Sequence, residues 1–412
     1  MPPLDGPAGG PRIPPWLTRG AIGIVLATFF SDVGHEMVTA VLPLYLTAIG
    51  LGPGALGLVE GVADLAFSLA KLGGGIVGQR LERKKPLTAI GYAITAVFSA
   101  LVATASSAVM IGTFRVVAWI GRGFRSPLRD FLLADEVAST HYARAYGVER
   151  SADMLGAVAG PLLALALLWA GAPLPAVIAV SVVPALLSVV AIVALTRDRG
   201  AEEFREPPGS AGDAGAAAAR LPRRFWLLLV GILVFGLGDF SRTFLIFLVA
   251  DAVGGSHAPG AFNAGVLAYT AHNAISGLAA PLAGRLGDRA PKPAVLVAGY
   301  GIGVGTNAIL ALAYGSPAGL AFAVLGSGVY IAVEETLEKA VVADILPREV
   351  RTLGFGILAC ANAVGDMVSS LYVGWLLATG HAGPAFALAA VLGAAGALWT
   401  LAVSRSGLRA AS

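Results

Sequence analysis

Twelve apolar runs constrain this chain more than any other feature of its sequence. Each run is about 20 residues or longer, the length that a helix needs to cross the hydrocarbon core of a bilayer. Hydrophobic residues make up 57% of the 412 positions and charged residues only 13%, which excludes a water-soluble globular domain and a disordered chain. We therefore expect an all-α membrane protein with twelve transmembrane helices. The predicted spans are residues 20–47, 54–78, 86–106, 109–128, 146–170, 174–195, 224–250, 261–284, 294–314, 317–340, 352–379 and 383–403.

Lysine and arginine residues are confined almost entirely to alternate connections between these runs. Of the 28 such residues, 25 lie in or near the two termini, the linker after the sixth run, and connections on the same side. Because positively charged connections stay in the cytoplasm, we expect a multi-pass protein of the cell inner membrane with both termini cytoplasmic. The first run contains Asp32, His35 and Glu36, so we interpret it as a retained span rather than a signal peptide.

A charged segment rich in glycine, alanine and proline divides the runs into two sets of six. We predict an N-terminal six-helix bundle over residues 1–195, a cytoplasmic linker over 196–222 and a C-terminal six-helix bundle over 223–412. An offset of 209 residues brings five widely separated pairs into register, which indicates that the two bundles are repeats around a shared path. The pairs are Gly75 with Gly284, Arg80 with Arg289, Asp135 with Asp344, Gly147 with Gly356 and Gly156 with Gly365.

The connections after the second and eighth runs share a pattern of glycine, an acid followed by arginine, and a basic cluster. It reads GRLGDRAPKP in the second half and GGIVGQRLERKK in the first, where Gln79 stands in place of the acid. The pattern resembles the loop 2/3 signature of the major facilitator superfamily, and the resemblance covers nearly the whole chain. It implies two pseudo-symmetric six-helix bundles that transport a solute by alternating access. The residues that carry it are Gly75, Arg80, Arg83, Gly284, Asp288 and Arg289.

The fifth run carries a second pattern, formed by Gly147, Gly156, Gly160 and Pro161. It resembles the motif associated with exporters of the same superfamily, which implies efflux. The segment GRGFRSPLRDFLLAD, which covers the end of the fourth run and the residues after it, is similar to a subgroup of bacterial permeases.

Three ionisable residues lie close together near the middle of the first run. Asp32, His35 and Glu36 are spaced i, i+3, i+4 and therefore share one face of a helix. Charged residues inside a span are costly unless they face a wet cavity or the interior of the bundle. We predict that this cluster exchanges protons with the path. The alternative is a packing network satisfied by neighbouring helices.

Further polar residues within the runs are candidates for proton coupling or substrate binding. Glu60 and Asp64 share one face of the second run. Asp239 and Arg242 in the seventh run either bind substrate or neutralise each other. His272 in the eighth run either lines the cavity or is a satisfied buried histidine.

Arg115 lies in the outer half of the fourth run, where an arginine facing lipid is improbable. It should point into the cavity or at a carboxylate such as Asp32, Glu36 or Asp153. An unpaired arginine in the cavity would favour anionic substrates, because a guanidinium binds a carboxylate through two parallel hydrogen bonds.

The offset of 209 residues also aligns the ends of the fourth and tenth runs and inverts the signs of their charges. We predict a cytoplasmic ionic gate in which these charges hold the two halves together in the outward-facing state and separate when the protein opens inward. The alternative places the arginines against lipid phosphates and pairs the acids within their own half. The aligned residues are Arg125 with Glu334, Ser126 with Glu335, Arg129 with Glu338 and Asp130 with Lys339.

Motifs of enzymes and cofactor sites do not occur in the sequence. His35 and Glu36 begin like the zinc motif HExxH, but Thr39 replaces the second histidine. No Walker A sequence occurs, and GRGFRS lacks the third glycine of a dinucleotide fingerprint. We expect no enzyme activity, no cofactor and no resident metal. The net charge of +3 is too small to indicate a nucleic acid partner.

The sequence thus predicts a monomeric secondary transporter whose partners are a small-molecule substrate, protons and the lipid bilayer. Proton-coupled efflux is the predicted mode. The alternatives are an uptake permease for an organic acid or similar polar solute, a divalent metal-ion exporter, and a membrane sensor that transports nothing.

Overall fold

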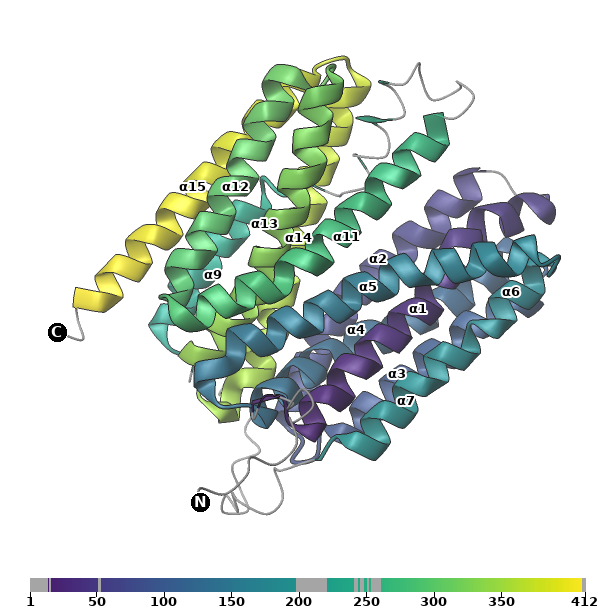
Figure 1. Cartoon of the computed structure of the whole chain (residues 1–412), viewed down its shortest axis with the longest axis horizontal. Helices are drawn as coiled ribbons and strands as arrows, with labels where there is room; N and C mark the ends of the chain where they lie inside the picture. Colours follow the sequence, from purple (N-terminus) through teal and green to yellow (C-terminus); the bar gives the residue numbers. More distant parts are fainter. Residues whose placement is uncertain are drawn as a thin grey trace, which may run out of the picture.

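The computed structural model describes residues 14, 16–50, 53–197, 221–240, 244, 248, 249, 252 and 261–409. The regular elements of this part of the chain are helices arranged in two groups (Figure 1). The first group contains α1 (Arg19–Ala48), α2 (Pro53–Gln79), α3 (Lys85–Leu101), α4 (Ala108–Glu136), α5 (Tyr142–Trp169), α6 (Leu174–Val180) and α7 (Val182–Leu195). The second contains α9 (Arg223–Gly236), α11 (Ala261–Arg289), α12 (Lys292–Ala313), α13 (Pro317–Ile345), α14 (Arg348–Ala378) and α15 (Ala382–Arg409). Short 3₁₀ turns, η1 (Val102–Thr104) and η2 (Ser139–His141), lie in two connections.

The predicted fold class of twelve spans in two six-helix bundles is confirmed. Helices α6 and α7 meet at Ser181 and together form one apolar span, so each group supplies six. Within the described chain, nine segments are long and apolar enough to cross a membrane by length and composition alone. Helix α4 is not one of the nine because charged residues recur along it, and α9 has only 14 residues of regular helix.

Helix α4 is longer than the sequence predicts. It continues to Glu136, whereas the predicted span ends at residue 128. Arg129 and Asp130 in this extension are 8% and 6% exposed, and Arg125 just before it is 2% exposed, so none of the three lies in a solvated connection. Because their side chains are satisfied by contacts with neighbouring helices, the polar segment stays helical.

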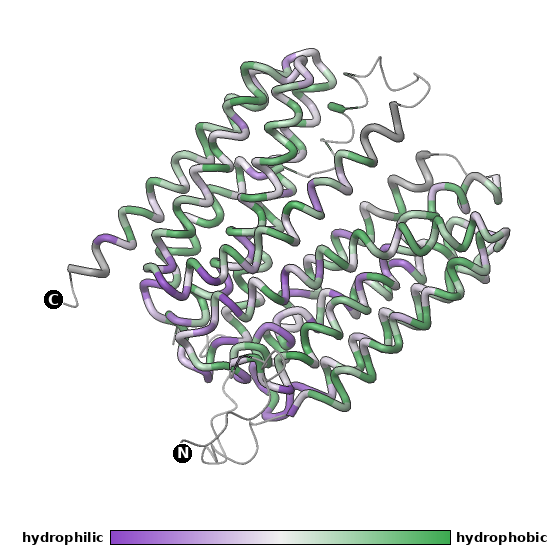
Figure 2. The backbone as a smooth tube through the Cα atoms, viewed as in Figure 1, coloured by the Kyte–Doolittle hydropathy of each residue, from purple (hydrophilic) through white to green (hydrophobic). Residues whose placement is uncertain are grey.

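Hydrophobic residues predominate along the helices of both groups, and hydrophilic residues gather at one end and between the groups (Figure 2). Leu312, Val109 and Leu278 are among the large apolar side chains that are more than two-thirds exposed. Water-exposed surfaces rarely carry contiguous apolar areas of this kind, so these faces are suited to lipid.

We call the end where α1 begins and α15 ends the basic end. It contains the connections formed by residues 80–84, 137–141, 290–291 and 346–347. The largest apolar core cluster lies towards this end and includes residues of both groups, such as Tyr146 and Phe355, whose ring centroids are 6.0 Å apart. Figure 1 shows the two groups converging at the basic end and diverging towards the other.

Two glycine contacts bring the halves together near the basic end. A Cβ atom added at Gly75 on α2 would lie 2.8 Å from the Cα of Gly356 on α14. A Cβ atom added at Gly147 on α5 would lie 3.2 Å from the Cα of Gly284 on α11 and would collide with the backbone of that helix. The offset of 209 residues exchanges these two contacts, so the sequence repeat is also a repeat of the interface.

Candidate functional site

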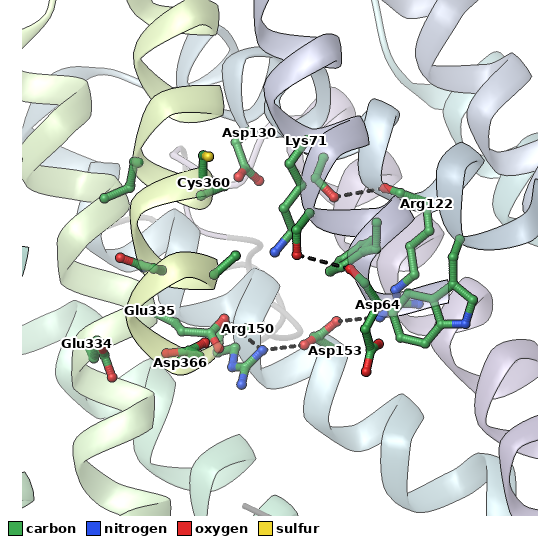
Figure 3. A pocket seen from close by; sticks show the side chains of 18 of the residues that line it. Asp64, Lys71, Arg122, Asp130, Arg150, Asp153, Glu334, Glu335, Cys360 and Asp366 are labelled. Atoms are coloured by element: carbon green, nitrogen blue, oxygen red, sulfur yellow. Dashed lines mark hydrogen bonds and ion pairs between the residues drawn. The ribbon is translucent and has the colours of Figure 1, made fainter. Parts of the chain in front are cut away.

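A cavity of about 790 Å³ lies between the two groups of helices (Figure 3). Both halves contribute polar side chains to it, and its size suits a drug-sized solute. The ionisable residues that line it are Asp32, His35, Glu36, Asp64, Lys71, Arg122, Arg125, Arg129, Asp130, Glu149, Arg150, Asp153, Asp239, Glu334, Glu335, Glu338, Lys339 and Asp366.

A chain of alternating charges crosses the cavity from the first half to the second. Asp32 on α1 is ion-paired with Arg122 on α4, and Arg122 Nη2 lies 3.9 Å from Asp153 Oδ1 on α5. Arg150 Nη1 is 2.5 Å from Asp153 Oδ2 and 2.8 Å from Glu335 Oε2 on α13 of the second half. We call these five residues the charge chain; Figure 3 shows Arg150 and Asp153 within it. It connects the predicted proton site directly to a contact between the halves.

The other two residues of the predicted proton cluster also line the cavity. His35 is 4% exposed, and its ring meets Trp119 edge to face with centroids 4.9 Å apart. Glu36 lies one helical turn beyond Asp32 on the same wall. The predicted common face of these residues is therefore the face that α1 turns to the cavity.

Two glycines of the predicted exporter motif allow α5 to approach this face. A Cβ atom at Gly156 would lie 2.8 Å from the Cβ of Asp32, and one at Gly160 would lie 2.8 Å from the Cβ of Glu36. Any larger side chain would push α1 away and displace both acids. Pro161 follows directly inside α5.

Two acids of the second half, Asp239 and Glu338, accept hydrogen bonds from neutral donors. The Tyr330 hydroxyl donates to Asp239 at 2.5 Å, and the Tyr300 hydroxyl donates to Glu338 Oε1 at 2.5 Å. Glu338 Oε2 also accepts from Asn362 Nδ2 at 2.7 Å.

Glu334 belongs to the same wall and is 5% exposed. Its buried Oε2 atom has no hydrogen-bond partner.

The structure brings together one aligned pair of the predicted ionic gate, Asp130 with Lys339, and pairs Arg125 and Arg129 differently. Arg129 does not pair with Glu338; its Nη1 lies 2.9 Å from Glu149 Oε1, and it also contacts its neighbour Asp130. Lys339 Nζ, from the second half, lies 3.7 Å from both Asp130 and Glu149. The Arg129 pair is wrong because Arg129 pairs with Glu149 of α5, a helix absent from the two-helix alignment, and Glu338 accepts hydrogen bonds from Tyr300 and Asn362.

Arg125 and Glu335 of the predicted gate also have other partners than the alignment gives them. Arg125 does not meet Glu334, because its Nη2 donates to Ser31 at 2.7 Å and its guanidinium stacks on Tyr92 at 3.7 Å. Ser126 was aligned with Glu335, but its hydroxyl donates to the Arg122 carbonyl of its own helix. Glu335 instead pairs with Arg150 of α5.

A further ion pair joins the halves outside the predicted set. Arg348 Nε lies 2.5 Å from Asp135 Oδ1, and its Nη2 lies 2.8 Å from Oδ2.

Two of the remaining candidate residues, Arg115 and His272, do not line the cavity. Arg115 is fully buried and donates to Thr39 Oγ1 at 2.9 Å, so it is not part of the cavity lining and the condition for an anionic substrate is not met. His272 is fully buried, shares a hydrogen bond of 2.8 Å with Ser327 through Nδ1, and is not among the residues that line the cavity. Arg242 and the side chain of Glu60 lie outside the described residues, whereas Asp64 lines the cavity.

The loop 2/3 signature forms equivalent contacts in the two halves. Asp288 accepts from the Arg144 amide at 3.4 Å and lies 3.2 Å from Arg144 Nε. At the position related by the repeat, Gln79 Oε1 accepts from the Leu353 amide at 3.3 Å. The glutamine thus keeps the backbone hydrogen bond of the acid without its charge. The basic residues of the signature, Arg80, Arg83 and Arg289, are exposed at the basic end.

Sequence reasoning missed Arg122, Glu149, Arg150 and Asp366 as cavity residues. The two arginines were counted among the basic connections. A signal was present in the spacing of Arg115, Trp119, Arg122, Ser126 and Arg129, which places them on one face of a continuous helix. That periodicity predicts a buried polar face and not a loop.

The family model described as Major Facilitator Superfamily matches residues 24–271 and 259–411. An uncharacterized MFS-type transporter of Methanocaldococcus jannaschii is 21% identical over 361 residues, which cover 87% of this chain and 89% of that protein. An uncharacterized protein of Mycobacterium tuberculosis is 23% identical over 375 residues, covering 89% and 88%.

Solved structures with the same fold include three transporters. A bacterial homologue of the iron transporter ferroportin in the outward-facing state has a TM-score of 0.72 at 14% identity, covering 93% of this chain and 99% of that one. The Escherichia coli fucose:proton symporter has a TM-score of 0.70 at 15% identity, covering 93% and 98%. The human organic anion transporter TETRAN has a TM-score of 0.69 at 16% identity, covering 94% and 100%.

Proposed function

Because the chain belongs to the Major Facilitator Superfamily, we propose that it is a secondary transporter that moves a small solute by alternating access, with proton-coupled efflux as its mode. The observation that carries this proposal is the charge chain, which joins a buried carboxylate in the cavity to a contact between the two halves. A single chain supplies both halves, so the monomer is the working unit.

The basic end faces the cytoplasm of a cell inner membrane in this proposal, in agreement with the distribution of lysine and arginine. The glycine contacts and the cross-half ion pairs then close the cytoplasmic side, and the structure represents an outward-facing state. The fold neighbour related to ferroportin is described in that same state.

Asp32 is the coupling residue in this mechanism. Its carboxylate neutralises Arg122 while the basic end is closed. Protonation of Asp32 removes that negative charge, so Arg122 draws Asp153 away from Arg150, and Arg150 loses the neighbour that fixes its side chain beside Glu335. The contact between the halves weakens and the cavity opens inward. The exporter-like glycines of α5, which position Asp32 and Glu36, support efflux as the direction.

A pair of spin labels at the basic end, one on each half, tests alternating access without knowledge of the substrate. We call these two labelled edges the lips. Thr140 and Glu349 are exposed at the basic end of the first and second halves, and Cys360 is the single native cysteine. In a Cys360→Ser background with labelled cysteines at both positions, we expect a second, longer distance to gain population on acidification. A single distance at all pH values, with no proton uptake into liposomes for any solute screened, would contradict the proposal.

Neutralising Glu335 tests the contact at the end of the charge chain. Glu335→Gln removes the partner of Arg150 in the second half, and the lost attraction is expected to cost about 1 kcal/mol of the closed state, a factor of about 5 in population. The labelled distance should shift towards the longer value at neutral pH. Glu82→Gln, an exposed acid in the connection after α2, is the matched control and should leave the distance unchanged. Identical distributions in the two variants would argue against Glu335 as a closing contact.

A further inference from the structure

Lys71 on α2 is a basic residue of the cavity lining that the proposed mechanism does not use. Figure 3 shows its half-buried side chain directed into the space between the two groups of helices. Its Nζ lies over the ring of Phe67, 4.2 Å from the centroid. In the part of the chain that the structure describes, no carboxylate lies within ion-pair distance of this ammonium and none of its three N–H donors makes a hydrogen bond.

The other basic residues of the described lining have partners or point elsewhere. Arg125 is 2% exposed, donates to Ser31 and stacks on Tyr92, so it faces the interior of the first half. Lys71 therefore supplies the cation in the cavity that Arg115 does not. The remaining four each lie within 4 Å of a carboxylate: Arg122, Arg129, Arg150 and Lys339.

Lys71 lies at the closed end of the cavity. A Cβ atom added at Gly356 on α14 would lie 3.2 Å from the Lys71 carbonyl oxygen and 2.8 Å from the Cα of Gly75. Lys71 precedes Gly75 by one helical turn, so it stands just beyond the contact that closes the basic end. Helix α2 continues to Gln79, about 12 Å further along its axis, so the ammonium belongs to the cavity floor and not to the membrane surface.

The surroundings of Lys71 indicate what kind of anion fits. One accessible ammonium balances one negative charge, and lysine binds a carboxylate as a point charge. The rings of Phe67 and Trp119 meet edge to face beside it, with centroids 4.9 Å apart, and Phe240 and Phe355 belong to the same lining. The cavity of about 790 Å³ accommodates an aromatic or apolar body behind such a head group.

We propose that Lys71 binds the carboxylate of a small organic monoanion whose aromatic or apolar body packs against Phe67 and Trp119. This inference rests on the proposed transport function, because it names the substrate class of the same cavity. The rival role for Lys71 is an ion pair with Glu335 or Asp366, which lie on the second-half side of the pocket (Figure 3). Glu335 already has Arg150 at 2.8 Å, which favours the solute as the partner of Lys71.

Two ligands of the same shape, one charged and one neutral, test the selection. Naphthoate and naphthamide are titrated at neutral pH against the full chain in nanodiscs, with empty nanodiscs as the blank for partitioning into lipid. We expect naphthoate to bind at least about tenfold more tightly than naphthamide. Equal affinities, or tighter binding of the cation naphthylmethylammonium, would overturn the proposal.

Variants at position 71 link the selection to this ammonium. Lys71→Gln should weaken naphthoate binding at least about tenfold and leave naphthamide binding unchanged, which shows that the cavity is intact, whereas Lys71→Arg should retain naphthoate. The control is Arg285→Gln, which changes an exposed base of α11 outside the cavity lining and should bind naphthoate like the unaltered protein. Unchanged naphthoate affinity in Lys71→Gln would refute the assignment. If that variant also shifted the distance between the lips, the rival contact between the halves would replace it.

The spin-label measurement separates this inference from the proposed function. If acidification changes the distance between the lips but naphthoate binds no better than naphthamide, transport stands and the anion site is refuted. If naphthoate binds through Lys71 but neither acidification nor the ligand changes the distance, the anion site stands and alternating access is refuted.

Discussion

Replacing Asp32 by asparagine is expected to reduce proton-driven transport to the background of empty liposomes. The amide has the shape of the carboxylate but carries no charge and takes up no proton in the relevant range. The variant should therefore hold the charge chain permanently in its protonated arrangement, and the distance between spin labels at positions 140 and 349 should no longer respond to pH. Two measurements check this: flux with and without an imposed proton gradient, and the distance between the spin labels as a function of pH.

The same substitution should also destabilise the protein, and a second variant separates the two effects. Removing one partner of a buried ion pair costs about 3–5 kcal/mol. Here the cost should be lower, because Arg122 keeps Asp153 at 3.9 Å. Asp32→Asn combined with Arg122→Gln removes both charges and should recover thermal stability without recovering flux. Proton-driven flux in the single variant would exclude Asp32 as the coupling residue.

A bulky side chain at Gly75 is expected to prevent closure of the basic end. An added Cβ at this position meets the Cα of Gly356 at 2.8 Å and the carbonyl oxygen of Thr352 at 3.2 Å, so valine leaves no room for α14. In Gly75→Val the labelled lips should show only the longer distance, and flux should be lost.

Gly73 provides a matched control two residues earlier on the same helix. A Cβ atom added there has no heavy atom within 4 Å, so Gly73→Val changes the helix propensity of α2 without touching the other half. We expect Gly73→Val to close and transport normally. If both valine variants remain closed, the glycine contact is not what sets the separation of the halves.

The sequence contained enough information for the architecture because long apolar runs, alternating basic connections and an offset repeat are properties of whole segments. They do not depend on how any helix is rotated about its axis. Asp32, His35 and Glu36 were also placed on one face correctly, since their spacing alone determines that they point the same way.

The ion-pair partners of side chains on different helices could not be predicted from spacing along the sequence. Aligning Arg129 with Glu338 through the repeat correctly places them at equivalent depths, but it says nothing about Glu149 of α5, which lies 2.9 Å from the arginine. Likewise, Arg122 was assigned to a connection between helices because it is charged. In the structure α4 continues through it, since the polar face of this helix is buried against its neighbours. Choosing partners requires the rotation and tilt of three helices at once, which a single sequence does not define.

The series arrangement of the charge chain has a consequence for its two ends. Asp32 and Glu335 belong to different halves and share no contact, yet each is connected to the other through Arg122, Asp153 and Arg150. A change of charge at either end alters how strongly every intermediate member is held. In a thermodynamic cycle, distant substitutions at these two positions should therefore be non-additive, as they are for residues that touch.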